Sequence, residues 1–68
     1  MAFQPRVDLY GLRTTVYGDG SLIEIGYLDE IIDQNTFVVD GATFFIDQSD
    51  DFTVDNGEII IYNAVMID

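Results

Sequence analysis

Short runs of β-branched and aromatic residues, separated by turns rich in Gly, Asp and Asn, limit most strongly what this chain can form. The clearest case is Thr36–Val39, then Asp40 and Gly41, then Ala42–Ile46. An Asp-Gly pair between two runs of β-formers favours a two-residue type I′ turn, since both positions need a positive φ. The sequence therefore predicts a hairpin here and an all-β fold.

Three further runs have strand character. They cover residues 12–17, 22–32 with a bend near Gly26, and 58–67; residues 7–10 are a short extended piece before Gly11, and 47–57 is an acidic loop. Five short strands joined in sequence predict an antiparallel meander, which curls because curling removes exposed edges. From Gly26 onward the pattern is similar to small OB-like barrels, so we expect a curled sheet or a small OB-like or SH3-like barrel. Residues 1–6 form an N-terminal arm and residues 7–68 a single β domain.

A domain of 68 residues buries only about 60% of the surface that its unfolded chain exposes, so it usually needs further stabilisation by disulfides, a structural metal or association. The chain has no cysteine and no histidine, which excludes disulfides and argues against zinc, whose preferred ligands are thiolate and imidazole. Association with another protein is the source of stabilisation that remains. We expect no cofactor.

The strands carry more apolar side chains than a half-exposed sheet needs. A strand with one solvated face should alternate apolar and polar residues, yet the last run is apolar on both faces. One face has Ile59, Ile61, Val65 and Ile67, and the other has Ile60, Tyr62, Ala64 and Met66. A thick barrel core that takes both rows is one interpretation. The other, which we prefer, is that the outward row is an interface with a partner or with copies of the same chain.

Thirteen acidic and two basic side chains give a formal net charge of −11. Binding to nucleic acid or to anionic lipid needs clustered Lys or Arg, so we expect neither a nucleic-acid nor a membrane partner. The charge suits a basic partner, or it keeps an apolar protein soluble. An acidic surface can also imitate nucleic acid, which leaves an inhibitor of a basic DNA- or RNA-binding protein, of the anti-defence type, as the alternative function.

Catalytic chemistry has little support. Nucleophilic hydrolases use Cys, or Ser with a His base, and the chain contains neither Cys nor His; we expect no enzyme. The acidic loop does have the spacing of a calcium-binding loop, although Phe52 stands where that loop needs glycine. A loop without an ion is the simpler interpretation. The calcium candidates are Asp47, Ser49, Asp51, Thr53, Asp55 and Glu58.

We therefore expect a non-enzymatic structural protein that binds neighbouring protein subunits in a homo- or hetero-oligomeric assembly. Small, acidic, cysteine-free chains of this character suit a minor component of a virus or phage particle, such as a capsid decoration (cement) protein or a tail or neck accessory. The N-terminal residues lack the basic start and apolar stretch of a signal peptide, so we expect the virion or host cytoplasm. The expected contact residues are Phe3, Arg6, Tyr10, Arg13, Tyr17, Phe45, Tyr62 and Met66.

Overall fold

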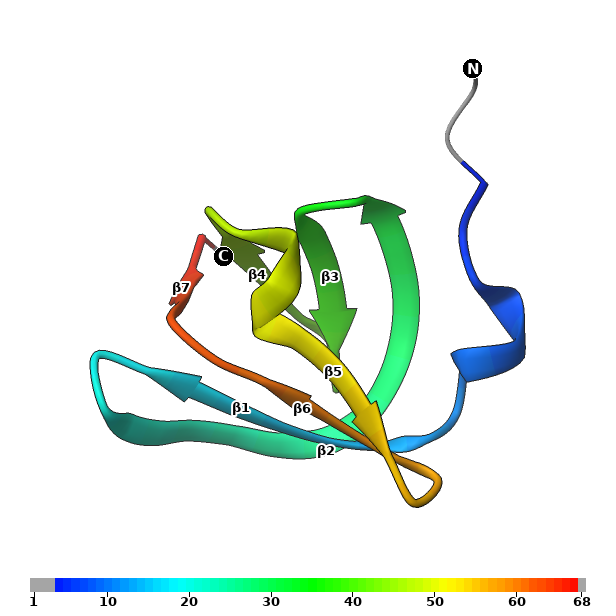
Figure 1. Cartoon of the computed structure of the whole chain (residues 1–68), viewed down its shortest axis with the longest axis horizontal. Coiled ribbons are helices and arrows are strands. Elements are labelled where there is room, and N and C mark those ends of the chain that lie inside the picture. The colour runs from blue at the N-terminus through cyan, green and yellow to red at the C-terminus, as the bar shows by residue number, and fades with distance from the viewer. Residues whose placement is uncertain (1–3, 68) are drawn as a thin grey trace.

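The computed structural model describes residues 4–67 and consists of one curled, seven-stranded sheet (Figure 1). The all-β class is confirmed, but the five-stranded antiparallel meander is wrong in the number of strands and in their pairing. The strands follow the order β5-β6-β1-β2-β3-β4-β7 across the sheet. The elements are η1 (Val7–Leu9), β1 (Arg13–Gly18), β2 (Ser21–Asp33), β3 (Thr36–Val39), β4 (Ala42–Ile46), η2 (Ser49–Asp51), β5 (Phe52–Asp55), β6 (Glu58–Ile61) and β7 (Ala64–Met66).

Three of the two-residue turns that join consecutive strands have a positive φ at both positions. The predicted Asp40-Gly41 turn joins β3 to β4 with φ of 51° and 83°, and Asp19-Gly20 joins β1 to β2 with 53° and 78°. The third, Asn56-Gly57, joins β5 to β6 with 53° and 80°. Two successive positive φ angles are the geometry of a type I′ turn, which matches the twist of the flanking strands. The predicted hairpin at 36–46 is confirmed.

The two additional strands come from the C-terminal third of the chain. Strand β5 pairs antiparallel with β6 where an acidic loop was predicted, because Phe52, Thr53 and Val54 are β-formers followed by a hairpin turn. The predicted single strand over 58–67 is broken at Asn63, whose φ is 55°. Asn tolerates this left-handed conformation better than most residues. The break lets the chain leave β1 and join β4.

One strand pair is parallel, which a meander does not contain. Strand β6 lies beside β1 with Thr15 opposite Ile60, while every other pairing is antiparallel. The long strand β2 connects the two halves of the sheet. It pairs with β1 up to Tyr27 and with β3 from Leu28, so the predicted bend near Gly26 lies where β2 changes partner.

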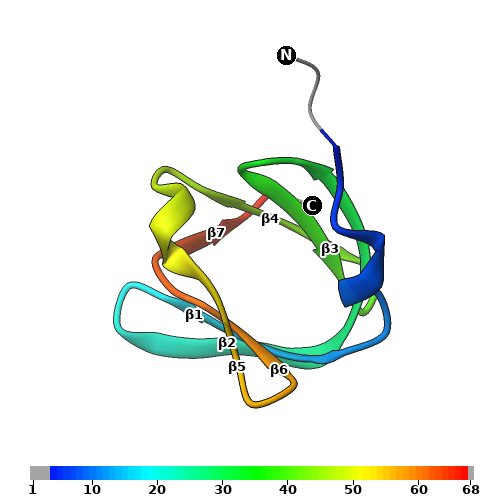
Figure 2. The same ribbon diagram turned by 45° about the vertical axis from the view of Figure 1, so that its right-hand side comes forward.

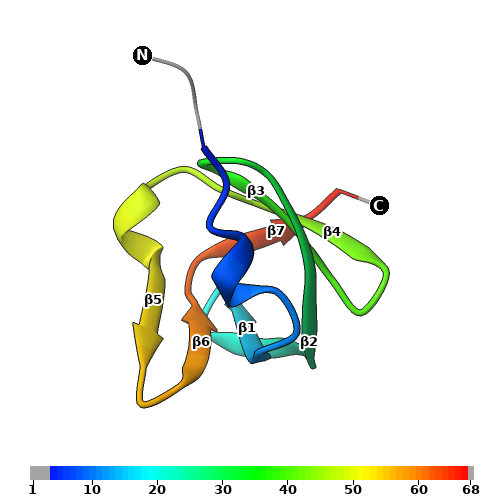
Figure 3. The same ribbon diagram turned by 90° about the vertical axis from the view of Figure 1, so that its right-hand side faces the viewer.

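The sheet wraps around one apolar core (Figures 2 and 3). Strands β1 and β7 approach each other across the curl: a Cβ on Gly18 would overlap the carbonyl oxygen of Ala64. Phe37 stacks on Phe52 with ring centroids 4.6 Å apart, which ties β5 to β3. The core consists of Leu9, Val16, Leu28, Ile31, Phe37, Val39, Phe44, Ile46, Ile59, Ile61 and Ala64, with buried Thr14 donating to the carbonyl oxygen of Leu12.

Candidate docking face

The outer surface of β6, β1 and β2 carries an apolar and aromatic patch, which we call the tyrosine face. Residues that pair across strands project their side chains to the same side of a sheet. Thr15 of β1 pairs with Ile60 on one side and with Ile25 on the other, so these three form a row. On either side of this row lie the Tyr17–Leu22 and Arg13–Tyr27 pairs. The apolar members of the tyrosine face are Tyr17, Leu22, Ile25, Tyr27, Ile60 and Tyr62.

The tyrosine face is accessible, and two of its rings stack on each other. Tyr27 is 61% exposed, Leu22 51%, Ile25 45% and Tyr62 44%. Tyr17 and Tyr62 stack with ring centroids 5.6 Å apart and planes 12° from parallel. Stacking of this kind is favourable for aromatic pairs, and it joins the two rings into one aromatic surface across β1 and the end of β6. Aromatic residues of this kind are enriched at protein–protein interfaces.

The charges around the tyrosine face are mixed rather than purely acidic. Arg13 is exposed on the same surface, and by register Glu58 of β6 lies in the position next to it. The other cation, Arg6, donates from Nη2 to Oδ2 of Asp8 at 3.0 Å. This hydrogen bond lowers the pKa of the Asp8 carboxyl and raises that of the Arg6 guanidinium. Arg13 is thus the cation available to a partner in residues 4–67.

The structure separates the predicted contact residues into distinct locations. Arg13, Tyr17 and Tyr62 come together on the tyrosine face, while Phe45 lies on the outer surface of β4, beside Val65 of β7. The remaining residues lie elsewhere: Met66 lines a groove at β7, Arg6 pairs with Asp8, and Phe3 lies outside the described residues.

Tyr10 has a structural role. Its ring packs against the core, and its hydroxyl oxygen accepts a hydrogen bond of 3.1 Å from the backbone N–H of Ile31. Gly11 adds a backbone bond of 2.8 Å to the carbonyl of Leu28. These contacts fasten the segment before β1 onto β2. They leave Tyr10 poorly placed to act as a free contact for a partner.

The predicted contact residues lack four members of the tyrosine face, which are Ile60 of β6 and Leu22, Ile25 and Tyr27 of β2. The signal was present, because Ile25 and Tyr27 alternate with Glu24 and Gly26. Gly26 lies on the opposite side of β2, where a Cβ would come within 2.6 Å of the Cβ of Asp40. The glycine thus admits the β3–β4 turn on one side while its neighbours project outward on the other.

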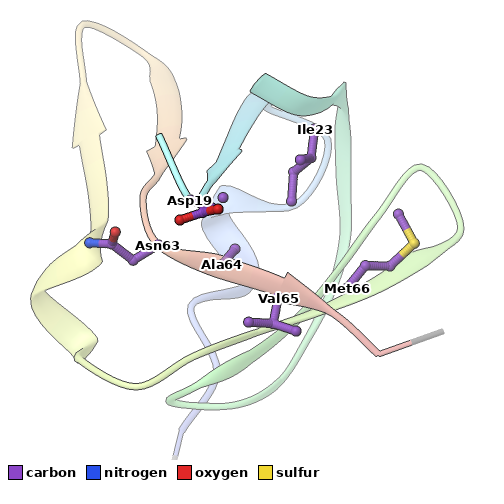
Figure 4. A pocket seen from close by; sticks show the side chains of 7 residues that line it. Asp19, Ile23, Asn63, Ala64, Val65 and Met66 are labelled. Atoms are coloured by element: carbon purple, nitrogen blue, oxygen red, sulfur yellow. The ribbon is translucent and has the colours of Figure 1, made fainter. Parts of the chain in front are cut away.

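A groove lies between β7 and the start of β2 (Figure 4). It has a volume of about 480 Å³. Ile23 projects into it from β2, and Met66 and Val65 come from β7. The carboxylate of Asp19 is its ionisable group, and the remaining lining is Gly18, Asn63 and Ala64. A hollow of about 360 Å³ lies next to it, between Tyr17, Asp51 and Tyr62.

The six calcium candidates do not converge. Asp47 precedes η2, whereas Asp55 and Glu58 flank the turn at the far end of β5. The hydroxyl of Thr53 donates to the carbonyl oxygen of Ile60 at 2.8 Å, as part of the β5–β6 hairpin. No group of three or more acidic residues in the described part of the chain is arranged to hold a metal ion. The spacing of a calcium loop is present, but η2, β5 and the Asn56-Gly57 turn occupy its place.

Comparison with protein families, with curated proteins and with solved structures finds no match to this chain. Both helices in residues 4–67 are single three-residue 3-10 turns, far short of the length and apolar character that crossing a membrane would require.

Proposed function

We propose that this chain is a non-enzymatic assembly protein whose tyrosine face docks on a neighbouring protein subunit. The observation that carries the proposal is the location of Leu22, Ile25, Tyr27 and Tyr62 on one outer surface, each 44–61% exposed. Large apolar side chains gathered on one face of a small protein are typical of an interaction site. A minor component of a virus or phage particle, such as a decoration protein or a tail or neck accessory, fits this character.

Burial supports the proposal quantitatively. Full burial of one large apolar side chain contributes about 1.5–3 kcal/mol, so covering four half-exposed ones contributes about 3–6 kcal/mol before the cost of association. A domain of this size has a total stability of about 3–10 kcal/mol. A partner on the tyrosine face would therefore add stabilisation comparable to that of the fold itself. This is the additional stabilisation that a short chain without cysteine or histidine needs.

Site-specific photo-crosslinking tests the proposal. A photoreactive phenylalanine replaces Tyr27 on the tyrosine face or, as the control, Gln34 in the exposed turn after β2. We expect one protein partner to be crosslinked from position 27 and not from position 34, with mass spectrometry identifying it. The same adducts from both positions, or none from position 27, would contradict the docking face.

The dependence of partner affinity on salt concentration distinguishes this function from imitation of nucleic acid. The acidic side chains of the described chain are concentrated in the turns and their flanks, including Asp19, Asp40 and Asp55. An inhibitor that relies on these charges would lose affinity steeply as salt rises, because ions screen exposed charges. Docking by apolar burial should persist or strengthen in high salt. Measuring the affinity of the identified complex at two salt concentrations distinguishes the two.

A further inference from the structure

Strand β7 is an edge that lacks the usual protection. Edge strands are normally guarded by charged side chains, proline or bulges, because their free backbone groups can pair with another chain. β7 and the residue after it, Ala64 to Ile67, contain none of these. Val65, Met66 and Ile67 are 60%, 50% and 58% exposed, the longest exposed apolar run among residues 4–67. The opposite edge, β5, ends in Asp55.

The hydrogen-bond register shows which backbone groups of β7 face outward. The N–H of Ile67 donates to the carbonyl oxygen of Thr43 at 2.9 Å, and Val65 lies opposite Phe45. In an antiparallel pair, alternate residues direct their N–H and C=O groups to the partner strand. The backbone of Met66 therefore faces away from β4. At Ala64 the same side is closed by Gly18, so the open part of the edge begins at Met66.

The groove adjoins this open edge and supplies side-chain contacts. Ile23 and Met66 form apolar walls on its two sides (Figure 4). Gly18 and Ala64, which lie in close contact, complete the lining. Its volume of about 480 Å³ is in the range of pockets that bind ligands, about 300–1,000 Å³. A strand added to β7 would place every second side chain toward these walls, since successive side chains in a strand alternate.

Charge selects the kind of strand. Asp19 is held at the rim by the β1–β2 turn, where its φ is 53°, and the whole chain carries a net charge of −11. An acidic segment would be repelled, and a lysine or arginine beside the apolar contacts would meet Asp19. A second copy of this chain would bring another −11 charge to the contact. The occupant that fits is therefore an extended, basic segment of a different protein.

We propose that an extended segment of a partner protein, with alternating apolar and basic side chains, adds to β7 at Met66 and fills the groove. This is the mode of strand addition, in which backbone hydrogen bonds give affinity and pockets for alternate side chains give specificity. The site is separate from the tyrosine face and does not depend on it.

The test uses the full chain and a capped peptide of about eight residues in which lysine alternates with valine or leucine. NMR titration should shift the amide of Met66 and the methyl groups of Ile23, and the Met66 amide should exchange more slowly with solvent. A peptide with glutamate in place of lysine should bind about tenfold more weakly. Met66→Lys, which places a charge on the edge, should weaken binding about tenfold.

Val54→Lys on the β5 edge is the matched control, since Val54 is 45% exposed and the charge change is the same; we expect its affinity within about twofold of the original chain. Asp19→Asn keeps a residue that tolerates the turn and should weaken binding of the basic peptide by about twofold. Four results would overturn the proposal: equal binding of both peptides, shifts that map away from β7, equal loss in the two lysine variants, or concentration-dependent shifts of Met66 without peptide, which would make a second copy the occupant.

Discussion

Replacing Gly18 by alanine tests the contact that brings β1 and β7 together across the curled sheet. A Cβ at this position would overlap the carbonyl oxygen of Ala64 and lie 3.0 Å from Cδ1 of Ile23. The nearest atom belongs to the backbone, so no side-chain rotation relieves the overlap. One of the two strands has to move, and the groove beside them changes shape.

The expected cost follows from this overlap. Forcing extra atoms into a packed site costs about 1–3 kcal/mol, and we expect about 2–3 kcal/mol because backbone must shift. For a domain of 60–100 residues, each 1 kcal/mol lowers Tm by about 4–8 °C. Gly18→Ala should therefore lower Tm by about 10–20 °C, measured by thermal unfolding with circular dichroism and by urea unfolding.

Gly20→Ala is the matched control, because alanine is unfavourable there through the backbone conformation and not through an overlap with other atoms. Nothing lies within 4 Å of a Cβ at Gly20, but its φ of 78° is unfavourable for alanine, at a cost of about 1–2 kcal/mol. The smaller effect should be seen here. If Gly18→Ala retained stability within about 0.5 kcal/mol while Gly20→Ala did not, the close approach of β1 and β7 would be refuted.

Three further predictions concern single contacts. Asn63→Ala should destabilise the fold by about 1 kcal/mol in urea unfolding while Asn63→Gly should not, because the break between β6 and β7 needs a positive φ; equal effects would contradict this. Phe52→Ala should cost about 3 kcal/mol through loss of the stack on Phe37, and a loss below about 1 kcal/mol would mean that β5 is not held there. The hydrogen bond from Arg6 lowers the pKa of Asp8. This pair therefore stabilises the fold at pH values above the ordinary pKa of the carboxyl, and the stabilisation is lost as the pH falls through the lowered pKa. NMR titration should find the midpoint of Asp8 below its ordinary value, and Arg6→Gln should return that midpoint to the ordinary value.

Local signals predicted much of the fold. The Asp40-Gly41 turn and its two strands follow directly from residue preferences, as does the bend of β2 near Gly26. The same rule would have found the β5–β6 hairpin at Asn56-Gly57, but the acidic residues around it suggested a loop. A net surplus of acids describes the solvent side of that segment and does not prevent Phe52 from packing inward on Phe37.

Non-local pairing could not be predicted. Nothing in residues 58–61 specifies a parallel neighbour, and the placement of β6 beside β1 depends on how the whole sheet closes. The break at Asn63 was also hidden, because the apolar run continues on both sides of it. This break changes which side chains face inward: Ala64 becomes buried and Val65 exposed.

The surplus of apolar side chains was predicted from strands that are apolar on both faces in a short chain, but its location was only partly predicted. Tyr17 and Tyr62 lie on the tyrosine face, whereas the β2 residues that complete it depend on the pairing of Thr15 with Ile25. Tyr10 was expected to contact a partner, yet its hydroxyl oxygen accepts a hydrogen bond from the backbone N–H of Ile31. Side-chain type alone does not distinguish these two uses of tyrosine.

The most direct test of the central claim measures binding and stability on one variant. Ile25→Thr combined with Tyr27→Thr removes apolar surface from the tyrosine face and retains β-forming residues; Ile32→Thr with Val54→Thr, at positions 48% and 45% exposed, is the control pair. We expect the first pair to weaken binding of the partner crosslinked from position 27 by about 100-fold, a change of about 2.7 kcal/mol, with Tm within a few degrees of the control. Unchanged binding in the first pair would contradict the role of the tyrosine face.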